Sequence, residues 1–236
     1  IKVHDLLPQF NASAATIRKD LTALTEAGLI YRTHGEVHLA AQNDIMLPFE
    51  SRCDLHAEAK RAIARAAVRE IQEGDSIILD SGSTTLEIAK LLGSFHNLTV
   101  ITNSLPAILA MNNTHISVSV IGGTFLPQNL SIQGPESERY ISQIEVDKAF
   151  ICSTGVRRDI GLVASNSLEG RIKHCMLSAA RRTYAVLDSA KFTTSSIVLF
   201  ADFEEIDCII TEKPIQDAQQ AKRFQELGTK IIIADT

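Results

Sequence analysis

Residues 13–35 read SAATIRKDLTALTEAGLIYRTHG and decide the fold of the first part of the chain. Ser13 is of a type preferred at a helix N-cap, and Gly28 is placed to end the helix that follows it. Apolar side chains recur at helical spacing and predict a buried stripe of Ile17, Leu21 and Leu24. The polar face is left to meet a partner, as in the reading helix of a winged helix-turn-helix.

The segments around this helix complete the same pattern. Residues 2–10 have helical spacing, but Pro8 predicts a short or bent helix because proline lacks an amide hydrogen. Residues 29–39 read as two short strands that turn at Gly35-Glu36 and form the wing. The start of the reading helix carries the side chains that a major-groove helix presents to bases and phosphates, namely Thr16, Arg18 and Lys19.

The charge of the chain limits how it meets nucleic acid. A net charge of −5 argues against a protein that coats DNA, so we expect DNA contact only over a small patch. Residues 1–41 carry four basic and four acidic side chains, and a charged helix alone is commonly just a solvated face. The order of helix, turn, helix and wing is therefore what predicts DNA binding.

The composition is that of a globular protein, with 45% hydrophobic and 22% charged residues among 236. No apolar run approaches the roughly 18 residues needed to span a bilayer. The chain begins at Ile1, without an initiator methionine or a basic-then-apolar leader. We therefore expect a cytoplasmic protein without membrane contact and with an incomplete N-terminus.

The pattern changes after the wing. Residues 40–54 show no sustained period and behave as a linker, and beyond them apolar strands alternate with helices. This alternation predicts an α/β fold with a mostly parallel sheet covered on both faces. The predicted strands are 76–80, 98–102, 117–121, 147–152, 183–187, 207–211 and 230–234, and the predicted helices are 57–71, 84–92, 104–111, 168–181 and 215–227. The predicted domains are a winged helix-turn-helix over 1–41, a linker over 42–56 and an α/β domain over 57–236.

The sharpest candidate site is the segment IILDSGSTTL at residues 77–86, where a buried strand runs through a small polar loop into a helix. Gly82 permits a tight turn, and hydroxyls together with unpaired amides at the helix start suit a phosphate. A capped strand-to-helix turn needs the same residue types and remains the alternative. The candidate ligand residues of this loop are Asp80, Ser81, Gly82, Ser83, Thr84 and Thr85.

Three other strand ends look alike: TNS at 102–104, GGT at 122–124 and STG at 153–155. In an open parallel sheet the carboxyl ends of the strands converge on one crevice, so four polar loops would line one pocket. The alternative is that asparagine and glycine merely make the turns. Glu169 and Lys173, four residues apart on a helix, either face the ligand or form a solvated surface pair, and the same two possibilities apply to Asp188 and Lys191.

Nothing in the sequence requires catalysis. There is no nucleophile elbow and no paired-carboxylate signature. One pair among the seven histidines has metal-ligand spacing, but it flanks the predicted turn, and the four cysteines are widely scattered. We expect no cofactor, no metal and buried free thiols.

Many residues along the chain match one family. In the N-terminal part these are Ser13, Thr16, Ile17, Arg18, Asp20, Leu21, Leu24, Gly28, Arg32, His34 and Gly35. Further on they are Pro48-Phe49-Glu50, Arg52, Lys60, Ile63-Ala64, residues 74–77, Asp80, residues 82–84, 102–104, Gly122-Gly123, Lys173, Asp188-Ser189 and Lys191-Phe192. Together they resemble the signature of DeoR-type bacterial repressors over nearly the whole chain.

The resemblance implies a function for each domain. In that family the large domain is similar to ribose-5-phosphate isomerase and binds a phosphorylated sugar or polyol, which weakens operator binding. It implies that ligand is held by the loop at residues 80–85 and by Thr102, Asn103, Gly122, Gly123 and Lys173. It implies operator contacts by Ser13, Thr16, Arg18 and Lys19, with Arg32 and His34 in the wing. Two departures stand out: Glu36 replaces the family's second wing glycine, and the family's first helix is missing ahead of Ile1.

The leading hypothesis is a homo-oligomeric repressor, dimer or tetramer, of a carbohydrate-utilisation operon, released from operator DNA by a phosphorylated sugar or polyol. An isomerase-like enzyme is the main alternative, although Asp80, Glu169 and Lys173 form no recognisable acid/base set. A ligand-responsive activator would use the same residues.

Overall fold

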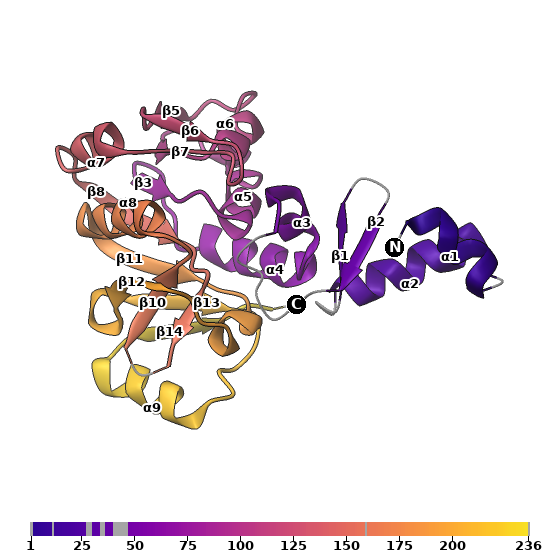
Figure 1. Cartoon of the computed structure of the whole chain (residues 1–236). Helices are drawn as coiled ribbons and strands as arrows, with labels where there is room; N and C mark the ends of the chain where they lie inside the picture. Colours follow the sequence, from indigo (N-terminus) through magenta and orange to yellow (C-terminus); the bar gives the residue numbers. More distant parts are fainter. Residues whose placement is uncertain are drawn as a thin grey trace. The chain divides into compact units, whose positions relative to one another are not determined.

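The computed structural model describes residues 2–10, 12–26, 30–33, 36–39, 47–158 and 160–235. The chain divides into two compact units, Ile1–Glu58 and Ala59–Thr236, whose elements are labelled in Figure 1. Among the described helices, none is long and apolar enough to cross a membrane.

The first unit contains helices and a hairpin. In chain order its elements are α1 (Val3–Phe10), α2 (Ala14–Glu26), β1 (Ile30–Thr33), β2 (Glu36–Leu39) and α3 (Phe49–Asp54). The predicted short first helix, the reading helix and the two wing strands are confirmed. Helix α3 lies in the segment 40–54, where the sequence predicted only a linker; it packs against β1, and six residues are too few to establish a period.

Helix α2 forms because its start is capped and one face is buried. The Ser13 hydroxyl accepts a hydrogen bond from the Thr16 amide at 3.1 Å, which satisfies one of the amides that a helix start leaves open. The core of the unit is a small cluster of Leu6, Ile17, Leu21 and Ile30.

The buried stripe of α2 ends differently from the prediction. Leu24 is 40% exposed, whereas Thr25 is buried at 4% and continues the i+4 spacing from Leu21. The Thr25 hydroxyl donates to the Leu21 carbonyl at 2.7 Å, so its polar group is satisfied inside the stripe. Placing Leu24 in the stripe was therefore wrong.

The hairpin also corrects one boundary. Strands β1 and β2 are antiparallel, and Thr33 pairs with Glu36. Glu36 thus begins the return strand and is not a turn residue. The other residue of the predicted turn, Gly35, lies outside the described residues.

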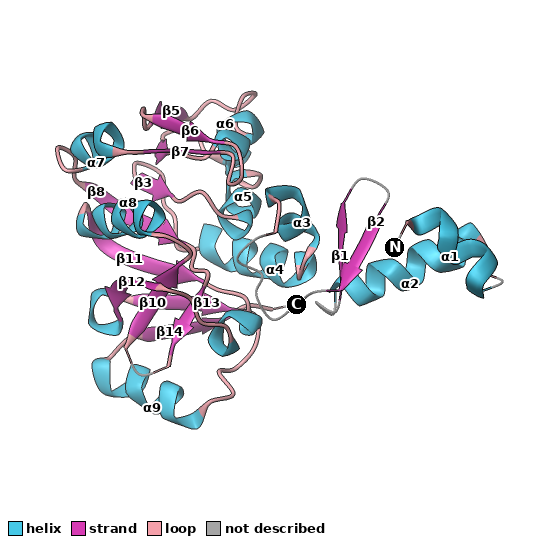
Figure 2. Ribbon diagram, in the orientation of Figure 1, coloured by secondary structure: helices cyan, strands magenta, loops and turns pink. Residues whose placement is uncertain are grey.

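The second unit is built on a seven-stranded parallel sheet (Figure 2). Its strand order is β14-β13-β11-β8-β3-β4-β5. The strands are β3 (Ser76–Leu79), β4 (Thr99–Thr102), β5 (Ser117–Val120), β8 (Val146–Ile151), β11 (Ala180–Val186), β13 (Cys208–Thr211) and β14 (Lys230–Ile233). The predicted parallel sheet is confirmed: its strands alternate with helices, and the inner strands are buried while the edge strands β5 and β14 are partly exposed.

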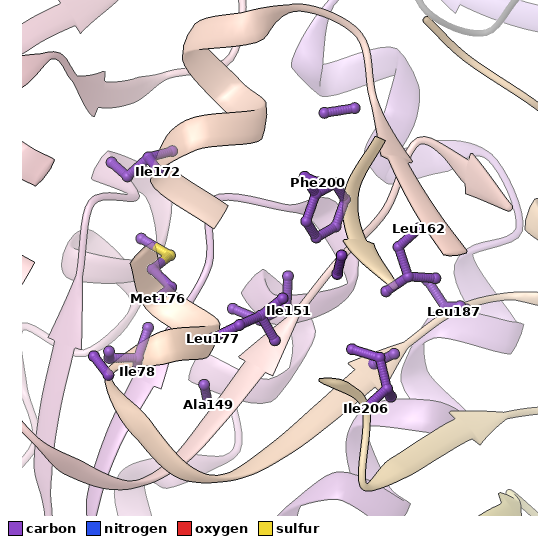
Figure 3. Close-up of a cluster of buried hydrophobic side chains, with 14 of the residues drawn as sticks. Ile78, Ala149, Ile151, Leu162, Ile172, Met176, Leu177, Leu187, Phe200 and Ile206 are labelled. Carbon is purple, nitrogen blue, oxygen red and sulfur yellow. The ribbon is translucent and has the colours of Figure 1, made fainter. Parts of the chain in front are cut away.

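Helices cover the two faces of the sheet. One hydrophobic cluster joins the strands to α4 (Ala57–Val68), α5 (Ser83–Ala89), η2 (Leu92–Ser94) and α6 (Leu105–Ala110). A second joins them to α8 (Ser167–Ser178) and α9 (Ala218–Leu227). Figure 3 shows part of this second cluster, including Ile172, Met176 and Leu177 of α8 and the strand residues Ile78, Ala149 and Ile151.

Short elements attached to the sheet were not expected from the sequence. A three-stranded antiparallel sheet has the order β12-β10-β9, and a separate hairpin pairs β6 with β7. The additional elements are β6 (Thr124–Leu126), β7 (Ser131–Gln133), α7 (Pro135–Ile141), β9 (Gly155–Arg157), β10 (Gly161–Ala164), η3 (Ser189–Thr193), β12 (Val198–Asp202) and η4 (Phe203–Glu205). Most are three to five residues long, too short to show a hydrophobic period.

Candidate functional site

The topology singles out one place on the parallel sheet. Strands β3 and β8 are neighbours, but from β3 the chain proceeds to β4 and β5 on one side, and from β8 to β11, β13 and β14 on the other. Ligands of open α/β sheets bind in the crevice at such a switch point, outside the carboxyl ends of the strands. Asp80 and Cys152 immediately follow β3 and β8 and therefore mark this crevice.

The Asp80 carboxylate joins these two strand ends. One oxygen accepts a hydrogen bond from the Ser81 amide at 2.7 Å, and the other accepts from the Cys152 amide at 3.0 Å. Lys173 of α8 donates to the same carboxylate and also to the Cys152 carbonyl at 3.1 Å. Asp80 is completely buried and Lys173 is 2% exposed, so this ion pair is part of the core.

Lys173 is held as a cation by its neighbours. Burial alone lowers the pKa of an ammonium, but the Asp80 and Glu169 carboxylates outweigh burial and raise the pKa of Lys173 above its ordinary value. The distance from Lys173 Nζ to Glu169 Oε1 is 3.6 Å. Lys173 and Glu169 therefore do not form the solvated surface pair that was one possibility from the sequence, and the ammonium of Lys173 is ion-paired with two carboxylates.

Gly82 is required by a close approach between the strand ends. A Cβ added there would lie 2.2 Å from Cys152 Sγ, well inside contact distance. The Thr85 hydroxyl donates to the Asp80 carbonyl at 2.5 Å and accepts from the Gly82 amide at 3.0 Å. Burial and the Asp80 charge raise the pKa of the Cys152 thiol, so the sulfur is a neutral packing group.

The other hydroxyls of the loop have a different environment. Ser81 and Thr84 are 8% and 5% exposed, and their hydroxyls, like that of Ser83, make no hydrogen bond to another described residue. Residues 83–85 also supply the first amides of α5, which have no acceptors within a helix. The loop thus offers several neutral donors beside a buried, internally balanced charge pair.

The ends of β4 and β5 lie next to this loop in the sheet. The Thr102 hydroxyl accepts from the Ser104 amide at 3.1 Å, and Asn103 holds β7 through two hydrogen bonds to Ile132, each 2.9 Å long. Gly123 has a φ of +143°, and a Cβ there would lie 2.8 Å from the Gln133 carbonyl oxygen. All four predicted strand-end loops therefore follow neighbouring strands, β8, β3, β4 and β5, along one edge of the sheet.

Sequence reasoning missed the contribution of β7 to this edge. Ser131 and Gln133 are buried at 0% and 1% exposure, and Ser131 forms a bridge with Ser104. A run of Ser-Ile-Gln before a Gly-Pro pair reads as an ordinary loop. Only the tertiary pairing with residues 103–104 brings these polar side chains to the site.

The predicted DNA-contacting residues of α2 lie at its exposed surface. Ser13, Thr16, Arg18 and Lys19 are all exposed, while the opposite face forms the core of the unit. Besides capping the helix, Ser13 lies with its hydroxyl 2.8 Å from that of Thr16. Arg32 belongs to β1, and His34 lies outside the described residues.

Within the ranges that the structure describes, no group of three or more histidine, cysteine or acidic side chains is arranged to hold a metal ion. All four cysteines are free thiols; Cys208 is buried, whereas Cys53, Cys152 and Cys175 are only partly buried, which corrects the expectation that all are buried.

The architecture defines a class of protein: a helix-turn-helix unit with an exposed helix face, joined to an α/β unit whose polar loops follow neighbouring strands at the switch point of a parallel sheet. Residues 1–43 match the DeoR-like helix-turn-helix domain, and residues 55–213 match the DeoR C-terminal sensor domain. The chain belongs to the DeoR family of transcriptional regulators.

Individual relatives agree with this assignment. The chain is 33% identical to the HTH-type transcriptional regulator IolR of Bacillus subtilis (strain 168), over 92% of this chain and 86% of that protein. It is 35% identical to the transcriptional repressor AccR of Agrobacterium fabrum (88% and 81%) and 31% identical to the L-fucose operon activator of Haemophilus influenzae (92% and 88%). The family and these relatives are transcriptional regulators and not enzymes.

Two solved structures resemble part of the chain at low identity. A ribose 5-phosphate isomerase A from Methanocaldococcus jannaschii is 17% identical with a TM-score of 0.43, over 58% of this chain and about half, 54%, of the isomerase. The tetrameric eIF2B-beta2-delta2 complex from C. thermophilum is 16% identical with a TM-score of 0.50, over 74% of this chain and 62% of that one. At such identities the likeness concerns the fold alone.

Proposed function

We propose that this regulator is a cytoplasmic repressor of a carbohydrate-utilisation operon and that a phosphorylated sugar or polyol releases it from its operator. The carrying observation is the combination of an exposed reading helix with a switch-point loop in which the hydroxyls of Ser81, Ser83 and Thr84 make no hydrogen bond to another described residue. The names of several relatives refer to repressors or to sugar operons, which supports the proposal.

The crevice suits the phosphate end of the effector. Ser81, Ser83 and Thr84 provide the donors, through hydroxyls and through the first amides of α5. Asp80, Lys173 and Thr85 position these donors without contacting the phosphate, because their own polar groups are already paired with one another or with the loop backbone. This division assigns binding to one group of the predicted ligand residues and positioning to the other.

Release requires that the effector prefer one arrangement of the protein. A ligand shifts an equilibrium only by its difference in affinity for the two states. The DNA-releasing arrangement must therefore bind the effector more tightly than the operator-bound arrangement does. By linkage, operator DNA then weakens effector binding by the same factor.

The test measures operator binding of the full chain to its own promoter DNA at moderate salt, with and without candidate sugar phosphates. The expected result is a specific complex that one of these phosphates dissociates. The double variant Ser83→Ala, Thr84→Ala should bind operator normally and lose the response. A matched control is Ser142→Ala, an exposed hydroxyl at the end of α7 that should leave both properties unchanged. A double variant that still responds fully would contradict the assignment of the loop.

Repression is favoured over activation in this proposal, but both signs occur among the relatives. The residues that bind DNA and effector would be the same in both cases. A reporter gene under the native promoter distinguishes them: deletion of the regulator should raise expression in the absence of effector. Lower expression after deletion would identify an activator.

We also propose a homo-oligomer, a dimer or a tetramer. A single helix-turn-helix reads one half-site, and two-fold symmetric proteins read pairs of half-sites about one or more helical turns apart. Light scattering coupled to size exclusion should give a multiple of the chain mass. A monomer at micromolar concentration would rule this out.

A further inference from the structure

Two buried side-chain oxygens beside the effector crevice lack hydrogen-bond donors. Asn103 Oδ1 and Gln133 Oε1 have no partner among the described residues, and their side chains belong to residues that are 0% and 1% exposed. Buried polar atoms in proteins are paired with very few exceptions, because an unpaired acceptor loses its hydration without compensation. A donor from outside the protein is the physical remedy.

The orientation of the Asn103 amide is fixed by its neighbours. Its Nδ2 donates to the Ile132 carbonyl at 2.9 Å, while its backbone carbonyl accepts from the Ile132 amide at the same distance. Exchanging the oxygen and nitrogen of the side chain would place two acceptors against each other. The unpaired atom of Asn103 is therefore an acceptor.

Gln133 also has an unpaired buried group, for a different reason. Its Nε2 donates to the Ser131 hydroxyl at 3.2 Å, within strand β7. Rotating this amide by 180° would let the hydroxyl donate to the oxygen and would leave a buried N–H unpaired instead. In both orientations one polar group of Gln133 remains open.

The surroundings place Gln133 between two predicted ligand loops. Strand β7 is attached to the end of β4 through Asn103, and Gln133 is paired with Thr124 directly after the Gly122-Gly123 turn. A Cβ on Gly122 would meet no atom within 4 Å, so there is open space beside this turn. Figure 2 shows β6 and β7 at the end of the sheet that carries β5 and α6.

We propose that Asn103 and Gln133 form a hydroxyl subsite for the effector: Asn103 accepts a hydrogen bond from one hydroxyl, and the open amide group of Gln133 pairs with a hydroxyl in either orientation. This inference rests on the proposed function and deepens it, because it assigns the two ends of the ligand. The phosphate lies against the donors of Ser81, Ser83 and Thr84, and the polyhydroxylated end lies against the two amides. Gln133 then determines specificity, since a site built to hydrogen-bond a hydroxyl rejects an analogue that lacks it.

The experiment uses matched pairs of ligands that differ by one hydroxyl. The probes are ribose 5-phosphate with 2-deoxyribose 5-phosphate, glucose 6-phosphate with 2-deoxyglucose 6-phosphate, and inorganic phosphate, each titrated into the full chain by calorimetry. The unmodified chain should bind the hydroxylated member of at least one pair about tenfold more tightly, the effect of about one neutral hydrogen bond.

Substitution of Gln133 should remove this preference. In Gln133→Met, which keeps the length of the side chain, the affinity ratio of that pair should fall to about one while inorganic phosphate binds as before. Gln220→Met is the matched control: Gln220 on α9 is 2% exposed and also has an unpaired Oε1, but lies away from the β4 and β5 loops, so the ratio should persist. Gln133→Ala removes the amide without adding a charge and should also bring the ratio to about one, which covers the case that the methionine variant does not fold.

The outcomes separate the two proposals. Phosphates that bind without any hydroxyl preference, or a preference that survives in Gln133→Met, would overturn the hydroxyl subsite and leave the proposed function standing. Loss of the preference in Gln220→Met as well would also overturn it, because the effect would not be local. Failure of every probe, inorganic phosphate included, to bind would overturn both.

Discussion

Helix α2 and helix α5 both begin with small polar residues, but the charged side chains near their starts have opposite environments. Arg18 and Lys19 of α2 are exposed, as contact with a polyanion requires. Asp80 and Lys173 are buried at 0% and 2% exposure and paired with each other. The role of a charged residue near a helix start therefore depends on its exposure. An exposed charge is available to a binding partner, whereas a buried ion pair holds the local structure.

The largest effect should come from separating the buried pair. Lys173→Met leaves the Asp80 charge uncompensated in the core and should lower the free energy of unfolding of the sensor unit by about 3–5 kcal/mol. Denaturant unfolding of the full chain measures it. The double variant Asp80→Asn, Lys173→Met removes both charges and should recover much of the loss. Equal destabilisation in single and double variants would mean that charge is not the cause.

A smaller loss is expected from crowding the loop. Gly82→Ala places a Cβ 2.2 Å from Cys152 Sγ, and the adjustment should cost about 1–3 kcal/mol of stability. Gly122→Ala is the control, because its Cβ meets nothing within 4 Å and should change stability by less than about 0.5 kcal/mol. If the two variants unfold alike, the contact between the strand ends is not tight.

Substitution of an exposed cation of α2 should change DNA binding and nothing else that is measured. Arg18→Ala should weaken operator affinity by about 1–3 kcal/mol if it reaches a base, with stability and effector affinity unchanged. Lys222→Ala, an exposed cation on α9, should leave operator affinity as it was. Fluorescence anisotropy with labelled promoter DNA measures both. Unchanged operator affinity in Arg18→Ala would remove this residue from the interface.

The smallest expected effect concerns the cap of the reading helix. Ser13→Ala removes the acceptor of the Thr16 amide and should destabilise the first unit by about 1 kcal/mol. Helical circular dichroism during thermal unfolding measures it. Ser13→Asp keeps an acceptor and should retain the stability, so a loss of equal size in both variants would show that capping is not the reason.

The elements that could be predicted from the sequence are those with a regular hydrophobic pattern. The seven sheet strands and helix α2 are long or apolar enough for their periodicity to be read, and the loop at residues 80–85 stood out because a buried strand ends in a polar turn. Helix α3 and strands β6, β7, β9, β10 and β12 were missed, since a few residues contain no period. The predicted stripe of α2 omitted Thr25, which is buried because its hydroxyl is satisfied by the helix itself.

By itself, the sequence determined the two-domain plan, the parallel sheet and the family, because these depend on local propensity, periodicity and residue motifs. The tertiary structure decided which polar residues are available. Pairing with Asp80 and Glu169 places the ammonium of Lys173 in the core. The attachment of β7 to Asn103 brought Gln133 beside the loops that follow β4 and β5. Both depend on contacts between segments far apart in the chain, and burial sets the free energy of every polar group they bring together.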